Sequence, residues 1–160
     1  MFFVIFFSNM LIQVDHGTLP GCADKVQLKL NINDFEYGVL GSLVYLGLLL
    51  GSATATGLYS KGHLIKSILG FSLTLNSICL LLFTTSTSFY VLGAMRFLTG
   101  FCQIFIVIYY PVWTDTFGPE KFKSIWLTFM LLASPLGLVL GYAVTYYMNM
   151  YKTWEWSFYL

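Results

Sequence analysis

The sequence predicts an all-α protein, a polytopic bundle of transmembrane helices. Of its 160 residues, 58% are hydrophobic, 19% are aromatic and only 9% are charged, whereas soluble domains carry about 25% charged residues. Five stretches reach the ~20 mainly apolar residues that a helix needs to cross the hydrocarbon core of a bilayer. The net charge of +1 and the lack of a basic run exclude the electrostatic footprint of nucleic-acid binding.

The first predicted span covers residues 1–23 and holds Asp15 and His16 in its second half. A cleaved signal peptide is the alternative, because the apolar start is followed by Gly-Cys-Ala. No basic residue precedes the apolar run, and Asp15 would lie between that run and the cleavage point. Both features favour a span that stays in the membrane.

The remaining spans follow in order within one membrane domain over 1–160. A polar connection is predicted over 24–37, a short basic loop follows the second span, and a turn at Thr-Ser-Thr-Ser joins the third span to the fourth. The predicted spans after the first are 38–58, 64–84, 89–113, 124–148 and an incomplete sixth at 156–160.

The lysines of the connections predict the orientation, because Lys and Arg in short loops accumulate on the cytoplasmic side of a membrane. The loops after the second and fourth spans hold Lys61, Lys66, Lys121 and Lys123, against Lys25, Lys29 and Lys152 on the opposite side. We therefore expect an integral multi-pass membrane protein with a cytoplasmic N-terminus. No feature distinguishes the plasma membrane from lysosomal or other internal membranes.

Three charged or titratable side chains fall inside the predicted spans: Asp15, His16 and Arg96. A charge at the bilayer centre costs at least about 2.5–3.5 kcal/mol, so such residues usually face a protein interior or a watery cavity. Residues three, four and seven apart share a helix face. By this spacing a polar face of the fourth span comprises Arg96, Thr99, Gly100, Gln103 and Tyr110, and one of the first span comprises Ser8, Asp15 and Cys22.

Two interpretations of Arg96 remain open. Its side chain could snorkel to the outer headgroups, or it could line a polar cavity near Asp15, where it would bind an anionic group or shift the pKa of a carboxylate. The second is favoured, because the polar face continues inward to Gln103, which snorkelling does not explain. His16 is as readily a neutral, hydrogen-bonded histidine at a helix end as a cavity group.

Small residues every four positions predict close helix packing. On the fifth span they are Ala133, Gly137, Gly141 and Thr145, and on the second Gly47, Gly51 and Ala55. Pro135 should kink the fifth span, because proline removes a backbone donor and clashes with the preceding turn. A kink beside such a seam would also suit the flexing point of a transporter.

No catalytic constellation is present in the sequence, and we predict neither an enzyme nor a cofactor. There is no nucleophile-elbow or phosphate-binding motif. Cys22, Cys79 and Cys102 lack the short spacing of metal ligands, so we interpret them as small packing residues rather than a metal site or a disulfide.

The order of several motifs resembles the N-terminal half of a major facilitator superfamily transporter of the Spinster-like branch. The motifs are Val-Asp-His followed by Leu-Pro in the first span, Asn-Ile-Asn-Asp-Phe-Glu-Tyr-Gly before the second, Arg-Phe-Leu-Thr-Gly-Phe-Cys-Gln in the fourth, Pro-Leu-Gly-Leu-Val-Leu-Gly-Tyr in the fifth, and Trp-Glu-Trp-Ser-Phe near the end. The resemblance implies two six-helix halves that rock about a central site. The first and fourth helices line that cavity in the family, so Asp15 and Arg96 would carry substrate or proton coupling, with Gln103 beside them.

The resemblance also implies a gating loop over 56–66. Lys61 matches the first basic position of the family's gating motif, Lys66 lies at the end of the same loop, and Asp115 matches the carboxylate that such a base contacts. Five positions depart from the family pattern. In the loop, Ser60 stands in place of the aspartate, and Thr56 and His63 stand in place of glycines. His16 replaces an arginine, and Gln103 replaces a glutamate that could bind a proton.

Together these features predict a secondary-active or facilitative transporter of a small organic or lipid-like solute, such as a lysophospholipid, a sphingolipid derivative or another amphiphilic anion. Its partners would be the bilayer, the solute and a proton or other coupling ion. Five spans and the start of a sixth are less than half of a twelve-helix carrier, so we expect a fragment, or a chain that needs a C-terminal half or a partner chain. The alternatives are a carrier of sugars, dipeptides or organic anions, and a non-transporting membrane scaffold or remnant.

Overall fold

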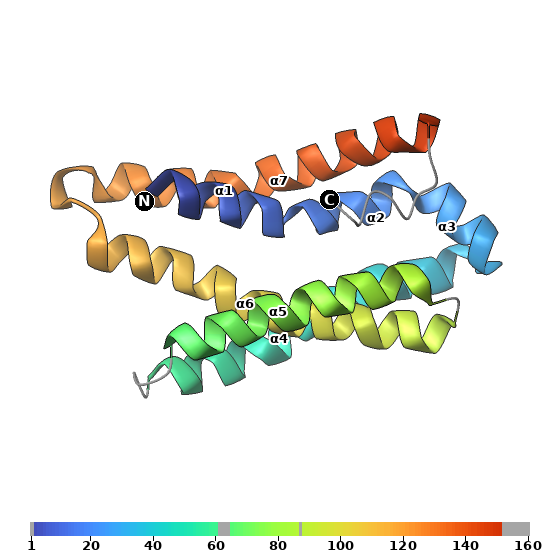
Figure 1. Ribbon diagram of the computed structural model, residues 1–160, viewed down its shortest axis with the longest axis horizontal. Coiled ribbons are helices and arrows are strands. Elements are labelled where there is room, and N and C mark those ends of the chain that lie inside the picture. The colour runs from blue at the N-terminus through green and yellow to red at the C-terminus, as the bar shows by residue number, and fades with distance from the viewer. Residues whose placement is uncertain (1, 61–64, 87, 152–160) are drawn as a thin grey trace. The chain divides into compact units, whose positions relative to one another are not determined.

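The computed structural model describes residues 2–60, 65–86 and 88–151, and most of these residues are helical (Figure 1). The elements in chain order are α1 (Phe2–Ile12), α2 (Val14–Gly21), α3 (Ala23–Leu30), α4 (Asp34–Tyr59), α5 (Ile65–Thr85), α6 (Phe89–Phe117), the short 3-10 helix η1 (Glu120–Phe122) and α7 (Lys123–Tyr151). The predicted all-α class is confirmed.

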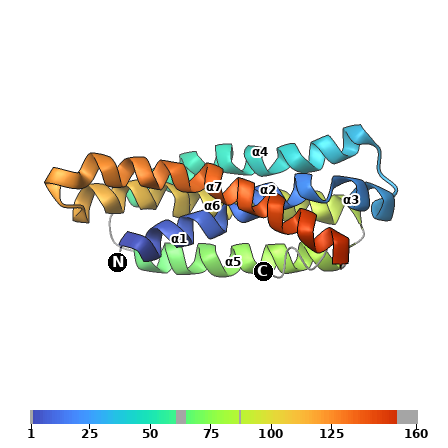
Figure 2. The same cartoon turned by 90° about the horizontal axis from the view of Figure 1, so that it is seen from above.

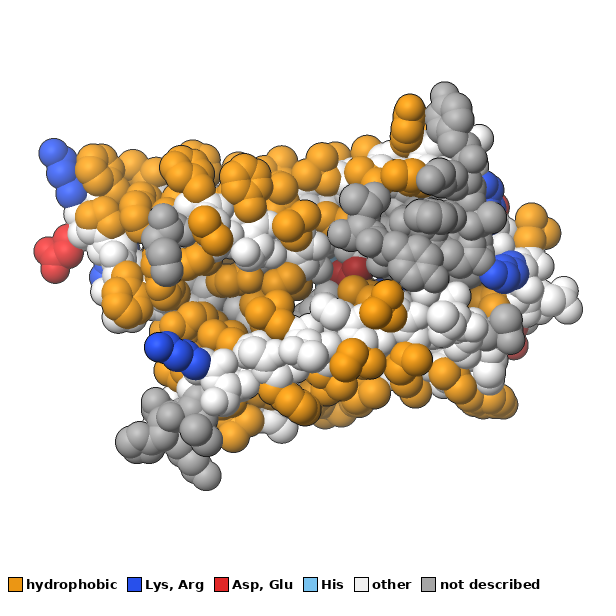
Figure 3. Space-filling view, viewed as in Figure 1, with side chains coloured by type: hydrophobic (Ala, Val, Ile, Leu, Met, Phe, Trp, Pro, Cys, Tyr) orange, Lys and Arg blue, Asp and Glu red, His pale blue; other side chains and the backbone are white. Residues whose placement is uncertain are grey.

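Five helical segments of the described chain are long and apolar enough to cross a membrane, as predicted. They are Phe2–Gly21, Asp34–Tyr59, Ile65–Thr85, Phe89–Phe117 and Glu120–Met150. Figure 3 shows hydrophobic side chains over most of the visible surface, with most of the visible charged side chains near helix ends. This distribution suits helices whose flanks face lipid. The predicted start of a sixth span, 156–160, lies outside the described residues.

The connection predicted over 24–37 is largely helical. Helix α3 occupies its first part, and α4 begins at Asp34 rather than at Gly38. Asn33 caps α4: its side-chain oxygen accepts a hydrogen bond from the backbone N–H of Glu36 at 2.9 Å, and the Glu36 carboxylate accepts one from the backbone N–H of Asn33 at 3.0 Å. This reciprocal pair is a capping box, which satisfies two backbone donors at the helix start.

The first span is interrupted rather than continuous. Helix α1 ends at Ile12 and α2 begins at Val14. At the junction the backbone N–H of Gln13 makes only long hydrogen bonds, 3.3 Å to the Asn9 carbonyl and 3.2 Å to the Met10 carbonyl. The hydrogen bonding is therefore long and irregular one residue before the segment that carries Asp15.

The chain divides into two compact units, and each is described by itself. Unit 1 comprises Met1–Ala23 with Val107–Leu160, and unit 2 comprises Asp24–Ile106. In unit 1, α1 and α2 run along α7 (Figure 1). A Cβ atom on Gly17 would overlap the Leu138 carbonyl, and one on Gly137 or Gly141 would overlap the carbonyl of Met10 or Val14. Because only glycine leaves this space, the backbones approach closely.

In unit 2, α4 and α5 flank the first part of α6, and Figure 2 shows α6 between them in projection. Gly47 and Gly51 of α4 face the α6 backbone at Phe97 and Phe101. Gly100 of α6 faces the Val44 carbonyl of α4 in return. On both the second and the fifth span, glycines of the small-residue seams therefore lie against the backbone of a neighbouring helix. Helix α7 continues through Pro135, and the predicted kink stays a prediction.

Candidate functional site

The polar face of α6 is buried. Arg96 is 2% exposed, and Thr99 and Gln103 are each about as deeply enclosed. Tyr110 lies two turns beyond Gln103 and is also buried. The spacing of three, seven and fourteen residues places all four side chains along one side of the helix. These four side chains form a buried polar stripe, and its role in transport stays a prediction.

Arg96 packs on an aromatic ring that the sequence did not single out. The guanidinium carbon lies 4.2 Å from the centroid of the Phe83 ring, on α5. A cation held over a ring face is attracted by the ring quadrupole, more strongly where both groups are desolvated. Snorkelling requires the charged group to reach water, and a side chain that is 2% exposed does not do so. The structure thus contradicts the snorkelling interpretation.

Gly100 does not belong to the polar face in the way its spacing suggested. It lies against the Val44 backbone, where a side chain would not fit. A glycine has no side chain that could line a cavity. The helical spacing of Gly100 did not indicate that it packs against α4. The α6 helix thus carries a packing position directly beside Thr99.

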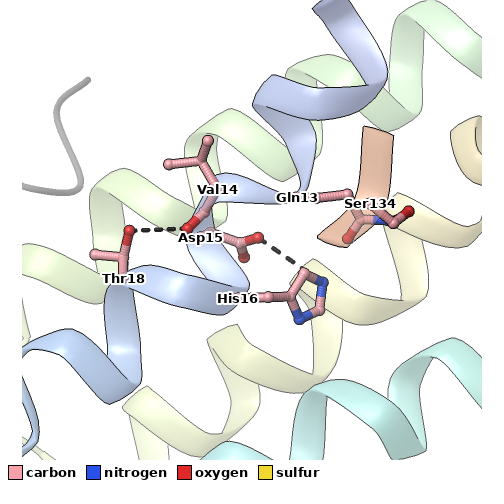
Figure 4. Close-up of polar contacts among 6 residues, drawn as sticks. All are labelled: Gln13, Val14, Asp15, His16, Thr18 and Ser134. Atoms are coloured by element: carbon pink, nitrogen blue, oxygen red, sulfur yellow. Dashed lines mark hydrogen bonds and ion pairs between the residues drawn. The ribbon is translucent and has the colours of Figure 1, made fainter. Parts of the chain in front are cut away.

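In unit 1, Asp15 and His16 lie together on the first turn of α2, just after the interruption (Figure 4). Asp15 is buried, and its Oδ1 lies 3.8 Å from His16 Nε2. That distance suits an ion pair when the imidazole is protonated and is too long for a direct hydrogen bond. The two side chains form a carboxylate–imidazole pair.

Polar side chains tie this segment to α7. Gln13 Nε2 donates to Ser134 Oγ at 3.0 Å, and Asn9 Nδ2 donates to the Met130 carbonyl at 3.0 Å. Near the C-terminal ends of α2 and α7, Asn149 Nδ2 donates to the Gly21 carbonyl at 2.9 Å. Asp15 belongs to unit 1 and Arg96 to unit 2, so the predicted proximity of these two residues stays a prediction.

The predicted gating residues are only partly described. Asp115 is 69% exposed and forms an ion pair with Lys123, with 3.1 Å between Oδ1 and Nζ. This pair closes the turn between α6 and α7. Lys66 is exposed near the start of α5. Lys61 lies outside the described residues, so its predicted contact with Asp115 stays a prediction.

Sequence reasoning missed a buried face of α5. Its members are Ser72, Asn76, Cys79 and Phe83, spaced by four, three and four residues. The Asn76 side chain is 6% exposed, and among the described residues no group hydrogen-bonds its Oδ1 atom. The signal in the sequence was an asparagine in the middle of an apolar span, on the face that also holds Ser72.

Apolar pockets lie in both units. One of about 520 Å³ lies in unit 2 and is lined by residues of α4, α5 and α6, among them Leu58, Phe71, Ser72, Leu75, Cys102 and Phe105. Another, of about 360 Å³, lies in unit 1 between the phenylalanines of α1 and Trp126 and Phe129 of α7. Among the described residues, no three His, Cys, Asp or Glu side chains gather closely enough to hold a metal ion. Cys22, Cys79 and Cys102 are buried.

Comparison with known proteins gives one family and two relatives. The sequence pattern of the Major Facilitator Superfamily matches residues 1–160. From Arabidopsis thaliana, "Probable sphingolipid transporter spinster homolog 1" is 27% identical over 135 residues, which is 84% of this chain and 27% of that protein. "Probable sphingolipid transporter spinster homolog 3" is 26% identical over 151 residues, 89% of this chain and 28% of that protein. The chain thus spans about a quarter of the length of these relatives, and no solved structure matches it significantly.

Proposed function

This chain belongs to the major facilitator superfamily, and on that premise we propose that it acts in the transport of a small organic or lipid-like solute across a membrane. In carriers of this kind, helical repeats rock about a site near the bilayer midplane and open it to each side in turn. The helices described above would supply part of one such repeat. The solute, the coupling ion and the remaining helices are parts of the proposal.

The observation that carries the proposal is the burial of Arg96 on the Phe83 ring, with Thr99 and Gln103 on the same helix face. A charge inside a span is costly and usually marks a substrate or ion path. The guanidinium is permanently charged and offers five donors in a planar fork, which suits carboxylate and phosphate groups. The favoured solute is therefore anionic.

The amphiphilic nature of the solute is supported by the relatives, which are named as sphingolipid transporters. A phosphorylated or otherwise anionic amphiphile combines the charge that Arg96 would bind with a chain suited to apolar spans. Sugars lack that charge, whereas dipeptides and organic anions carry it without the chain. Comparing these solutes in one assay separates the proposal from its runner-up.

Coupling to protons distinguishes secondary-active transport from facilitative transport. Gln103 has no ionisable group, so in this proposal the Asp15–His16 pair would carry the coupling proton. In a secondary-active carrier, an imposed proton gradient would drive accumulation through this pair. In a facilitative carrier the gradient would leave the final solute level unchanged.

The test is uptake into proteoliposomes that contain the full-length protein. Replacing Arg96 by methionine keeps much of the side-chain volume and removes the charge. Hydrogen bonds to charged groups contribute about 1.5–3 kcal/mol, so Arg96→Met should lower the uptake of an anionic amphiphile by about tenfold or more. Lys121→Met, at an exposed position of η1, is the matched control and should transport normally.

Each alternative has its own result in this assay. Uptake of the anionic amphiphile by Arg96→Met at the level of the unmodified protein would refute the assignment of Arg96. Uptake of sugars or dipeptides alone would favour the other branch of carriers. A folded protein that moves none of these solutes would point to the scaffold interpretation.

A further inference from the structure

The buried faces of α5 and α6 can be aligned with each other from the contact between Phe83 and Arg96. The two helices follow one another through a short turn and run in opposite directions. Seven residues back along α5 from Phe83 is Asn76, and seven forward along α6 from Arg96 is Gln103. Each step is about 10 Å at 1.5 Å per residue, so Asn76 and Gln103 lie at the same depth of the helix pair.

The 520 Å³ pocket begins at the same depth and continues in the same direction. Its α5 residues run from Leu75 back to Ser67, and its α6 residues are Phe101, Cys102 and Phe105. Ser72 lines the pocket and also belongs to the buried face that holds Asn76. The pocket therefore meets the buried face of α5 at Ser72, and its lining reaches about 13 Å from Asn76 along α5.

Asn76 is the polar side chain at this level whose acceptor atom is not used. It is 94% buried, and no donor among the described residues reaches its Oδ1. A buried acceptor without a donor disfavours the folded state unless something else supplies the donor. A transported molecule with a hydroxyl or N–H group would do so.

We propose that α5 and α6 bind an anionic amphiphile lengthwise: its acidic head on Arg96, a hydroxyl or N–H group on Asn76 Oδ1, and its hydrocarbon chain in the pocket beside Leu75 and Phe105. This inference rests on the proposed transport function and specifies its substrate class. The order of the three sites is the reason for it. A permanent cation, then an amide acceptor, then an apolar pocket follow one another along a single helix pair of unit 2.

The test measures binding to the full-length protein in lipid nanodiscs, with empty nanodiscs as the baseline. The first probe is oleoyl lysophosphatidate, which carries a phosphate, one hydroxyl and one chain. The second is its analogue with hydrogen in place of that hydroxyl. The third is glycerol phosphate, which lacks the chain. The unmodified protein should bind the first probe about tenfold more tightly than the second, a difference typical of one well-placed hydrogen bond.

Asn76→Leu keeps the size of the side chain and removes the acceptor. It should weaken the hydroxyl probe about tenfold and leave the deoxy probe unchanged, so that the two probes bind alike. It should also unfold at the same or a higher temperature than the unmodified protein, since a buried acceptor is removed. Ser77→Ala, on the exposed side of α5, is the matched control and should change neither probe. A lower unfolding temperature, or retained preference for the hydroxyl, would overturn the role of Asn76.

The pocket is tested separately with Leu75→Trp, which fills it. This change should weaken both chain-bearing probes and leave glycerol phosphate unaffected; unchanged binding of the chain-bearing probes would overturn the pocket assignment. Loss of both acyl probes in Arg96→Met with no effect of Asn76→Leu would keep the proposed function and refute this inference. An unmodified protein that binds none of the probes would refute both.

Discussion

At the scale of single residues, the position of Arg96 could be predicted from the sequence, whereas its contact with an aromatic ring could not. Its charge within an apolar span identified it at once, and the polar side chains at three and seven residues further on defined its face of α6. Its ring partner was not identifiable. Phe83 lies on another helix, and a phenylalanine near the end of an apolar span looks the same whether it faces lipid or a guanidinium.

The pairing of Arg96 with Phe83 can be measured with a double-mutant cycle. Phe83→Leu and Arg96→Met should each destabilise the protein in detergent, and the double mutant should lose about 1–2 kcal/mol less than the sum, because the cation–π attraction is counted once. The measurement is the free energy of unfolding from denaturant titration of each protein. Phe71→Leu, at a position 69% exposed, is the control and should show no coupling to Arg96. Strictly additive losses at Phe83 and Arg96 would contradict the contact.

At the scale of helices, the number and order of the spans could be predicted because each is a long apolar run. The small-residue seams were also predictable for α4 and α7, where glycines recur every four positions. Their partners were not singled out: Gly17 and Gly21 on α2 lie four residues apart against α7, and Gly100 on α6 faces α4. Which helix a seam packs against depends on the tertiary arrangement, which local spacing does not specify.

The start of α4 was set too late for a different reason. Hydropathy begins to rise at Gly38, whereas the helix begins at Asp34 behind the Asn33–Glu36 capping box. The polar first turn of a helix is invisible to a search for apolar residues. The spacing Asn-x-x-Glu was present in the sequence and would have corrected the boundary.

Two glycines on α4 provide a matched test of the seam. A methyl group at Gly47 would overlap the Phe97 carbonyl of α6, whereas one at Gly57 would meet nothing within 4 Å. Gly47→Ala should therefore lower the free energy of unfolding by about 1–3 kcal/mol through overpacking. Gly57→Ala should raise it by up to about 1 kcal/mol, since alanine favours the helix. Equal effects at the two positions, measured by denaturant titration in detergent, would show that the α4–α6 approach is less close than described.

At the scale of the whole molecule, the family and the class of membrane protein follow from properties spread along the entire chain, which is why sequence alone was sufficient. The predicted proximity of Asp15 to Arg96 is of another kind and stays a prediction. It depends on how helices far apart in the sequence are brought together, and local spacing carries no information about that.

The orientation in the membrane is a further prediction at this scale. With the N-terminus in the cytoplasm, Ser60 after α4 faces the cytoplasm and Ser86 after α5 faces the opposite side. Because the three native cysteines are buried, a new cysteine at either position can be labelled against a low background. Ser86→Cys should react with an impermeant maleimide on intact, right-side-out vesicles, and Ser60→Cys only after permeabilisation. The reverse pattern would place the N-terminus outside.

The pairing of α1 and α2 with α7 also bears on how the protein enters the membrane during synthesis. The first span has a mean hydropathy of 1.2, the lowest of the five, against 1.9 for the last. Its polar side chains at Asn9 and Gln13 donate hydrogen bonds to acceptors on α7, which is made after every other described helix. We therefore expect the first span to be inserted stably in the bilayer only after the fifth span has been synthesised and has packed against it. The part of the chain that is made first would then reach its final position last.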